Sequence, residues 1–87
     1  MKGVRSKAVK HGGRQLRLVE YTPAMEAHWC EKGHVGYVLE GRFEISFDDE
    51  TVIYESGDGV FIPSGLQHRH MGRALTGVVR CVFVEDV

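Results

Sequence analysis

Two clusters of histidine and cysteine are the part of this sequence best suited to chemistry. One contains His28 and Cys30, followed by His34, and the other contains His68 and His70. Residues two apart on a β-strand point to the same side, so each close pair would share a face. Imidazole and thiolate are good ligands for zinc, and imidazole also suits iron, nickel and copper. Two such pairs on neighbouring strands are therefore expected to converge on one metal ion.

The spacing of these residues is more specific than their types. The stretch from residue 28 to 41, with His28, Cys30, His34 and a glycine seven residues further on, resembles the first sequence motif of the cupin superfamily. The stretch GDGVFIPSGLQHRHMG, residues 57–72, resembles the second cupin motif, in which glycine, proline, glycine and histidine recur in this register. The sequence looks like one of the small single-domain bacterial cupins.

The resemblance implies an all-β fold of the cupin type, a double-stranded β-helix or jelly-roll barrel, with one domain over residues 1–87. It also implies a metal ion held by His28, Cys30, His34 and His68. The chain departs from the family pattern at two of these positions, because Cys30 replaces a histidine and His34 replaces a glutamate. Gly72 stands where the second motif often has asparagine.

The charge balance of the implied site favours a soft divalent metal. Three neutral histidines and one cysteine thiolate leave a divalent ion at a net charge of +1, as does the family's usual set of three histidines and one carboxylate. The thiolate softens the site and favours zinc, with iron or nickel as alternatives. A thiolate beside ferrous iron and oxygen is liable to oxidise, which disfavours oxygenase chemistry.

Other roles remain open for some of these side chains. His28 and Cys30 could be a half-buried strand pair without function, and His34 could be a pocket histidine that binds no metal. His70 shares the face of His68, where it is a candidate proton shuttle, a fifth ligand or a solvent-exposed side chain. Cys81 lies in an apolar run and is expected in the core.

Short alternating segments separated by turn residues indicate an all-β protein without a helix of three turns. Glycines are expected at the turns, including Gly41, Gly57 and Gly65. Strand alternation turns Trp29 and Tyr37 away from the site. The expected strands cover residues 15–21, 34–40, 42–47, 51–54, 60–62, a segment that contains residue 68, and 76–84.

Composition limits the classes of function. The chain has 87 residues, two cysteines and a net charge of −1, which argues against nucleic-acid binding and against a disulfide framework. No apolar run is long enough to span a membrane, and the basic N-terminus lacks the apolar core of a signal peptide. We expect both cysteines to be reduced and the protein to be cytoplasmic.

The leading hypothesis is a metal-binding protein that binds or transforms a small organic molecule in the barrel. The alternatives are a ligand- or metal-sensing module without enzymatic activity, and a metal-free binding or structural dimer. The final strand, residues 76–84, is apolar on both faces, and Tyr37 and Leu39 point away from the site. We therefore expect a homodimer that buries these residues between subunits or under the N-terminal strand.

Overall fold

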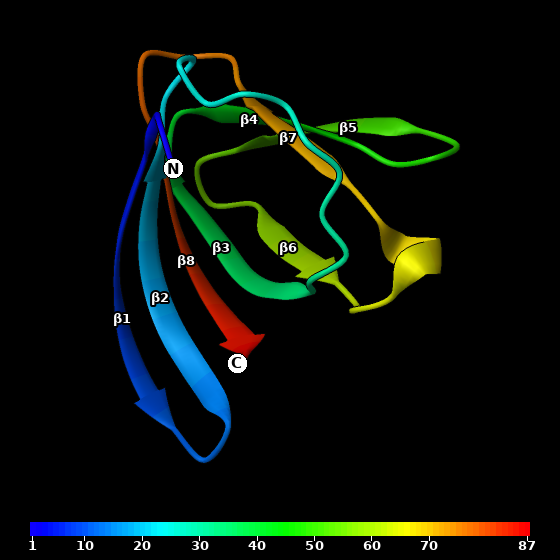
Figure 1. The fold of residues 1–87 in the computed structure, drawn as a ribbon. Coiled ribbons are helices and arrows are strands. Elements are labelled where there is room, and N and C mark those ends of the chain that lie inside the picture. Colours follow the sequence, from blue (N-terminus) through cyan, green and yellow to red (C-terminus); the bar gives the residue numbers. More distant parts are fainter.

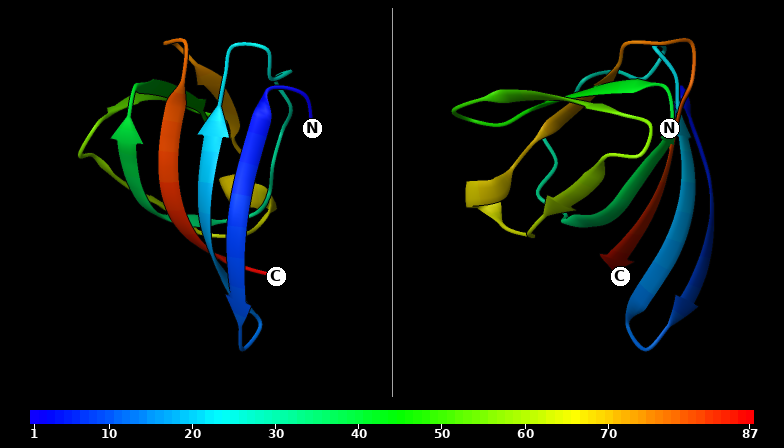
Figure 2. Two further views of the ribbon diagram at one scale, coloured as in Figure 1. Left: turned by 90° about the vertical axis from the view of Figure 1, so that its left-hand side faces the viewer. Right: turned by 180° about the vertical axis from the view of Figure 1, so that it is seen from behind.

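The computed structural model describes all residues, 1–87, as two antiparallel β-sheets that face each other (Figure 1). The larger sheet has the strand order β1-β2-β8-β3-β6, and the smaller has the order β5-β4-β7. Figure 2 shows the curvature of the larger sheet, with β1, β2, β8 and β3 side by side. The strands are β1 (Val4–His11), β2 (Arg14–Tyr21), β3 (His34–Glu40), β4 (Arg42–Ser46), β5 (Thr51–Glu55), β6 (Gly59–Ile62), β7 (Met71–Ala74) and β8 (Val79–Asp86).

The fold is the expected all-β jelly roll. The one helical element is a 3-10 turn, η1 (Leu66–His68), and no helix is long and apolar enough to cross a membrane. Gly41, Gly57 and Gly65 adopt positive φ angles of 85°, 92° and 132°. These glycines therefore stand at turns, as expected, where a Cβ would be strained.

Alternation along the strands sends one set of side chains into the space between the sheets. On β4, Phe43 and Ile45 are buried, and on β8, Val79, Cys81 and Phe83 are buried. The same alternation on β3 leaves Val38 buried and turns Tyr37 and Leu39 outward, as the sequence predicts. The core thus lies between the two sheets, and its rim carries the polar residues described below.

The segment between β2 and β3, residues 22–33, crosses from the larger sheet to the smaller one without forming a regular strand. It is held by the backbone of Cys30, which pairs with His70 in an isolated antiparallel bridge. Further along, the amide of Gly65 donates to the Glu31 carbonyl, and the amide of Gly33 donates to the Ser64 hydroxyl. These bonds place the two histidine- and cysteine-bearing segments side by side.

Candidate metal centre

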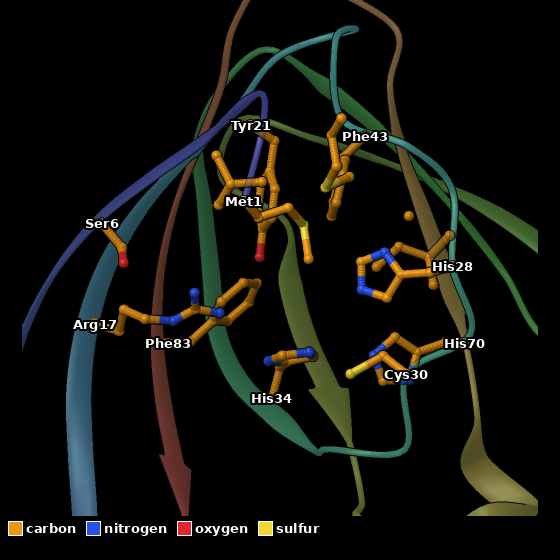
Figure 3. Close-up of a pocket in the computed structure, with 14 residues that line it drawn as sticks. Met1, Ser6, Arg17, Tyr21, His28, Cys30, His34, Phe43, His70 and Phe83 are labelled. Atoms are coloured by element: carbon orange, nitrogen blue, oxygen red, sulfur yellow. The ribbon is translucent and has the colours of Figure 1, made fainter. Parts of the chain in front are cut away.

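Cys30, His34 and His70 bring one ligand atom each into a cluster in which these atoms all lie within 4.8 Å of one another. Cys30 and His70 lie directly opposite each other across their β-bridge. The amide of Cys30 donates to the His70 carbonyl at 2.7 Å, and the amide of His70 donates to the Cys30 carbonyl at 2.9 Å. His34 enters from the start of β3 in the larger sheet. The cluster therefore joins three separate segments of the chain (Figure 3).

His34 is fixed by a buried glutamate on the last strand. Its Nδ1 atom lies 2.5 Å from Oε2 of Glu85. Glu85 also accepts hydrogen bonds from Arg17, at 2.8 and 2.9 Å, and from Gln15, at 2.8 Å. Burial raises the pKa of Glu85, but the hydrogen bonds from His34, Arg17 and Gln15 outweigh it and lower the pKa to about 2. The ionised carboxylate can only accept, so in the neutral imidazole of His34 the proton lies on Nδ1 and the Nε2 lone pair faces the pocket.

His70 presents its Nε2 atom in the same way. Its Nδ1 atom donates to the backbone carbonyl of His68 at 3.0 Å, and its Nε2 atom is buried without any hydrogen-bond partner. Burial lowers the pKa of His70, against the raising effect of that carbonyl, and nearby His34 and His28 lower it further. A buried, neutral imidazole with an unused lone pair is equipped to bind an electron-pair acceptor.

His28 lies at the rim of the same pocket and outside the three-residue cluster. It is exposed, and its Nδ1 atom lies 3.1 Å from the carbonyl oxygen of Glu26, two residues away. A carbonyl oxygen can only accept, so Nδ1 of His28 is the donor in this contact, and its Nε2 atom makes no bond to the backbone. His28 and Cys30 both line this pocket, as their spacing predicts, although Cys30 is the only residue of this segment in a β-bridge.

The structure does not bring the side chain of His68 to the cluster, although the sequence motif implies that it is a ligand. His68 ends the η1 turn and lines a separate pocket with Asp48 and Tyr54. The sequence interpretation assumed one strand through residues 68–70, whereas the turn interrupts it and β7 begins only at Met71. His70, expected at the edge of the site, takes the inward position, and His68 contributes its carbonyl oxygen to hold it.

Arg17 and Glu85 were missed by reasoning from the sequence. The signal was present in the last strand, where Val79, Cys81 and Phe83 alternate into the core and the next inward position is Glu85. A carboxylate at such a position requires buried donors, and Arg17, one strand away, supplies two of them.

The cluster opens into a cavity of about 330 Å³ between the two sheets. The apolar part of its wall contains Tyr21 and Phe43, whose rings stack at a centroid distance of 4.7 Å, together with Met25 and Phe83. No acidic side chain lines the cavity. A small molecule in this cavity would thus meet aromatic rings and the unused imidazole nitrogens.

Trp29 points away from the pocket, as the sequence predicts, since its neighbours His28 and Cys30 line the pocket and Trp29 does not. Its ring stacks under the guanidinium of Arg69, whose Cζ atom lies 4.5 Å from the ring centroid. Arg69 also forms an ion pair with Asp48 at 2.8 Å. Because Trp29 and Arg69 are next to Cys30 and His70 in the chain, this contact holds the two ligand-bearing segments together from the outside.

Residues 17–85 match the family model described as a cupin domain. The chain therefore belongs to the cupin family. No curated protein matches it.

Solved structures share the fold at low sequence identity. A protein of unknown function from Rhizobium leguminosarum has a TM-score of 0.79 and 24% identity, over 97% of this chain and 81% of that chain. A cupin-2 domain protein from Shewanella frigidimarina has a TM-score of 0.75 and 21% identity, over 95% and 80% of the two chains. The EutQ protein of Clostridium difficile has a TM-score of 0.73 and 20% identity, over 95% and 67%. Together these matches show the fold.

Proposed function

We propose that this cupin binds a divalent transition metal through Cys30, His34 and His70, and a small organic molecule in the adjoining cavity. The observation that carries the proposal is the buried Nε2 atom of His70, which has no partner within the chain. Leaving a polar atom buried and unpaired costs about 1–3 kcal/mol, and a metal ion would remove that cost. Both imidazoles are backed by an acceptor on Nδ1, which is the usual support of a metal-binding histidine.

The donor set fits zinc best. Two neutral imidazoles and one thiolate leave a divalent ion at a net charge of +1, the same value as for the four-ligand set that the motif implies. Donors around a tetrahedral zinc lie roughly 3.5 Å apart, so the three side chains would draw together slightly on binding. A bound ion would supply Lewis acidity, and the chain itself would orient its ligands through Glu85 and the His68 carbonyl.

Metal analysis of purified variants tests the ligand set, with His68 as the matched control for His70. We expect His70→Ala and His34→Ala to lose zinc, and His68→Ala to retain it. Cobalt loading should give a thiolate-to-metal absorption band that disappears in Cys30→Ser. Both variants must be folded by circular dichroism. If His68→Ala then loses zinc and His70→Ala retains it, the ligand set implied by the motif is correct and the proposed set is wrong.

His28 decides between catalysis and sensing. Three protein ligands leave an open position for water or substrate, which is typical of catalytic zinc, whereas four protein ligands close the site. The exposed His28 at the rim can serve as proton donor to a molecule in the cavity or as the fourth ligand. His28→Ala that keeps its zinc supports an open site, and a large drop in zinc affinity supports a closed site suited to sensing.

We further propose a homodimer through the outer face of the five-stranded sheet. The N-terminal strand does not cover this face, because β1 extends the sheet at its edge by pairing with β2. The strand registers align two apolar rows across the face, and several members are strongly exposed, such as Val9 at 72% and Phe61 at 75%. The first row consists of Val9, Leu16, Val84, Val35 and Phe61. The second row, beside the first, consists of Leu18, Val82 and Tyr37.

A third row on this face supports a second copy as the occupant. Arg5, Glu20, Arg80 and Glu40 lie in this order across β1, β2, β8 and β3, so their charges alternate. If the two-fold axis of the dimer runs parallel to the strands and passes between β2 and β8, the facing sheet of the second copy has the reverse strand order. This arrangement would bring Arg5 against the partner's Glu40 and Glu20 against the partner's Arg80, and it would stack the apolar rows on each other.

The mass of the protein in solution tests the dimer. We expect a dimer by light scattering at micromolar concentration and a monomer for Leu18→Lys. The matched control is Ile53→Lys on the smaller sheet, since Ile53 is 46% exposed and Leu18 is 43% exposed. A wild-type monomer would refute the proposal.

We also propose that the protein acts in a reducing compartment such as the cytoplasm. Such a compartment would keep Cys30, a free thiol, available for metal.

A further inference from the structure

The cavity wall contributed by β2 has unused hydrogen-bond donors. Arg17 and Tyr21 lie four residues apart on this strand, and both line the cavity. In Figure 3 they approach the cavity from the side opposite His28, Cys30 and His70. A molecule between the two sides would contact both groups of residues.

Arg17 uses only part of its guanidinium on Glu85. Its Nε and Nη2 atoms donate to the two oxygens of that carboxylate, and its third nitrogen, Nη1, makes no contact with it. Arg17 is only partly buried and its side chain lines the cavity, so the guanidinium can be reached from there. The N–H groups of Nη1 are thus available to a ligand.

Tyr21 adds a second donor beside the first. Its hydroxyl oxygen accepts a hydrogen bond from the Arg17 guanidinium, and the hydroxyl proton has no acceptor within the chain. Burial raises the pKa of Tyr21, although Arg17 opposes this, so the phenol keeps its proton. The N–H groups of Arg17 Nη1 and the O–H group of Tyr21 are thus neighbouring donors, and they favour a ligand group that only accepts hydrogen bonds.

The charges around the cavity select the sign of that group. The Arg17 and Glu85 charges cancel, and no acidic side chain lines the cavity. With a divalent ion and the Cys30 thiolate, the proposed centre adds a net charge of +1. An anion would neutralise the filled pocket.

We infer that the ligand is a small, flat carboxylic acid whose carboxylate binds Arg17 Nη1 and the Tyr21 hydroxyl. This inference rests on the proposed small-molecule function and names its ligand class. The planar guanidinium edge suits a planar carboxylate, and the stacked rings of Tyr21 and Phe43 with Phe83 suit a flat apolar body. A cavity of about 330 Å³ has room for roughly ten non-hydrogen groups of water size.

Calorimetric titration with benzoate, and with benzamide as its neutral analogue, tests the inference. We expect benzoate to bind at least about tenfold more tightly than benzamide, and Tyr21→Phe to weaken benzoate binding by about tenfold. Tyr54→Phe is the matched control, because Tyr54 lines the separate pocket with His68. Arg17→Lys, which keeps the charge but not the planar edge, should weaken benzoate and leave benzamide unchanged.

The titrations are run on metal-free and zinc-loaded protein, so that failure of the metal proposal is seen separately. Zinc retention tests the metal ligands, and benzoate binding to metal-free protein tests Arg17 and Tyr21. Equal affinities for benzoate and benzamide would overturn the inference. Benzoate binding only in the zinc-loaded protein, unchanged in Tyr21→Phe, would place the carboxylate on the metal and would overturn it as well.

Discussion

The imidazole of His34, at the start of β3, is tied to the carboxylate of Glu85, near the end of β8, by a bond of 2.5 Å between Nδ1 and Oε2. This contact joins two adjacent strands at the mouth of the cavity. It determines which nitrogen of His34 faces the cluster, and the same carboxylate neutralises Arg17. Glu85 therefore supports both the proposed metal centre and the proposed carboxylate site.

Replacing Glu85 should impair metal binding and stability together. Glu85→Ala leaves His34 free to change tautomer and leaves the largely buried Arg17 unpaired. We expect a 10- to 100-fold loss of zinc affinity and a decrease of about 3 kcal/mol in the free energy of unfolding. Zinc titration and urea unfolding measure the two effects.

Two variants separate these effects. Glu85→Gln still accepts a hydrogen bond from His34 but does not neutralise Arg17, so it should keep more of the zinc affinity than of the stability. Glu44→Ala, which removes the exposed pair with Arg73, should change stability by less than about 1 kcal/mol. Wild-type zinc affinity in Glu85→Ala would show that the His34 contact does not support a metal ligand.

The two cysteines should differ in reactivity. Cys81 is fully buried, and burial raises its pKa to about 12, although Arg17 opposes this, whereas Cys30 is only partly buried. At pH 8 we expect one thiol to react quickly with iodoacetamide and the second only after unfolding. Zinc should protect the fast thiol, and Cys30→Ser should lack it. A fast thiol in Cys30→Ser would contradict the assignment.

Alternation was the part of the fold that the sequence predicted well. Along β3 and β4, residues two apart face the same side, and the outward Tyr37 and inward Phe43 follow directly from that period. The glycine turns were predictable for a local reason, since Gly41 and Gly57 adopt backbone angles that other residues rarely take. Local rules therefore specify the strands and their faces.

The composition of the site was less predictable, because it depends on where strands are interrupted and on partners distant in sequence. The η1 turn rotates His68 away and brings in His70, which the period-two rule alone does not indicate. Glu85 and His34 are 51 residues apart, and only the pairing of β3 with β8 brings them together. The spacing of the motifs identified the region of the site, but it did not indicate that His70 replaces His68 or that Glu85 holds His34.

Acid should remove the contribution of the ion pairs on the outer face. Arg80 and Arg5 donate to Glu20 and lower its pKa below the usual 4.5. A carboxyl with a lowered pKa in the folded state stabilises the fold above about pH 4.5, and this contribution is lost as the pH falls through the folded-state pKa. Glu20→Gln should be less stable than wild type at pH 7, with a difference that shrinks toward pH 3. Urea unfolding at fixed protein concentration measures it, and a difference independent of pH would contradict this account.

A side chain at Gly72, where the second cupin motif often has asparagine, should destabilise the fold. A Cβ at Gly72 would lie 2.6 Å from Cζ of Phe43, whose ring is buried and stacked on Tyr21. Gly72→Ala must displace this ring pair, at a cost of about 1–3 kcal/mol in the free energy of unfolding. The shifted rings also narrow the cavity, so benzoate binding should weaken. The matched control is Gly77→Ala, because a Cβ at Gly77 meets no atom within 4 Å. Equal stability of the two variants by urea unfolding would show that the Phe43 ring moves freely and that Gly72 does not shape the pocket.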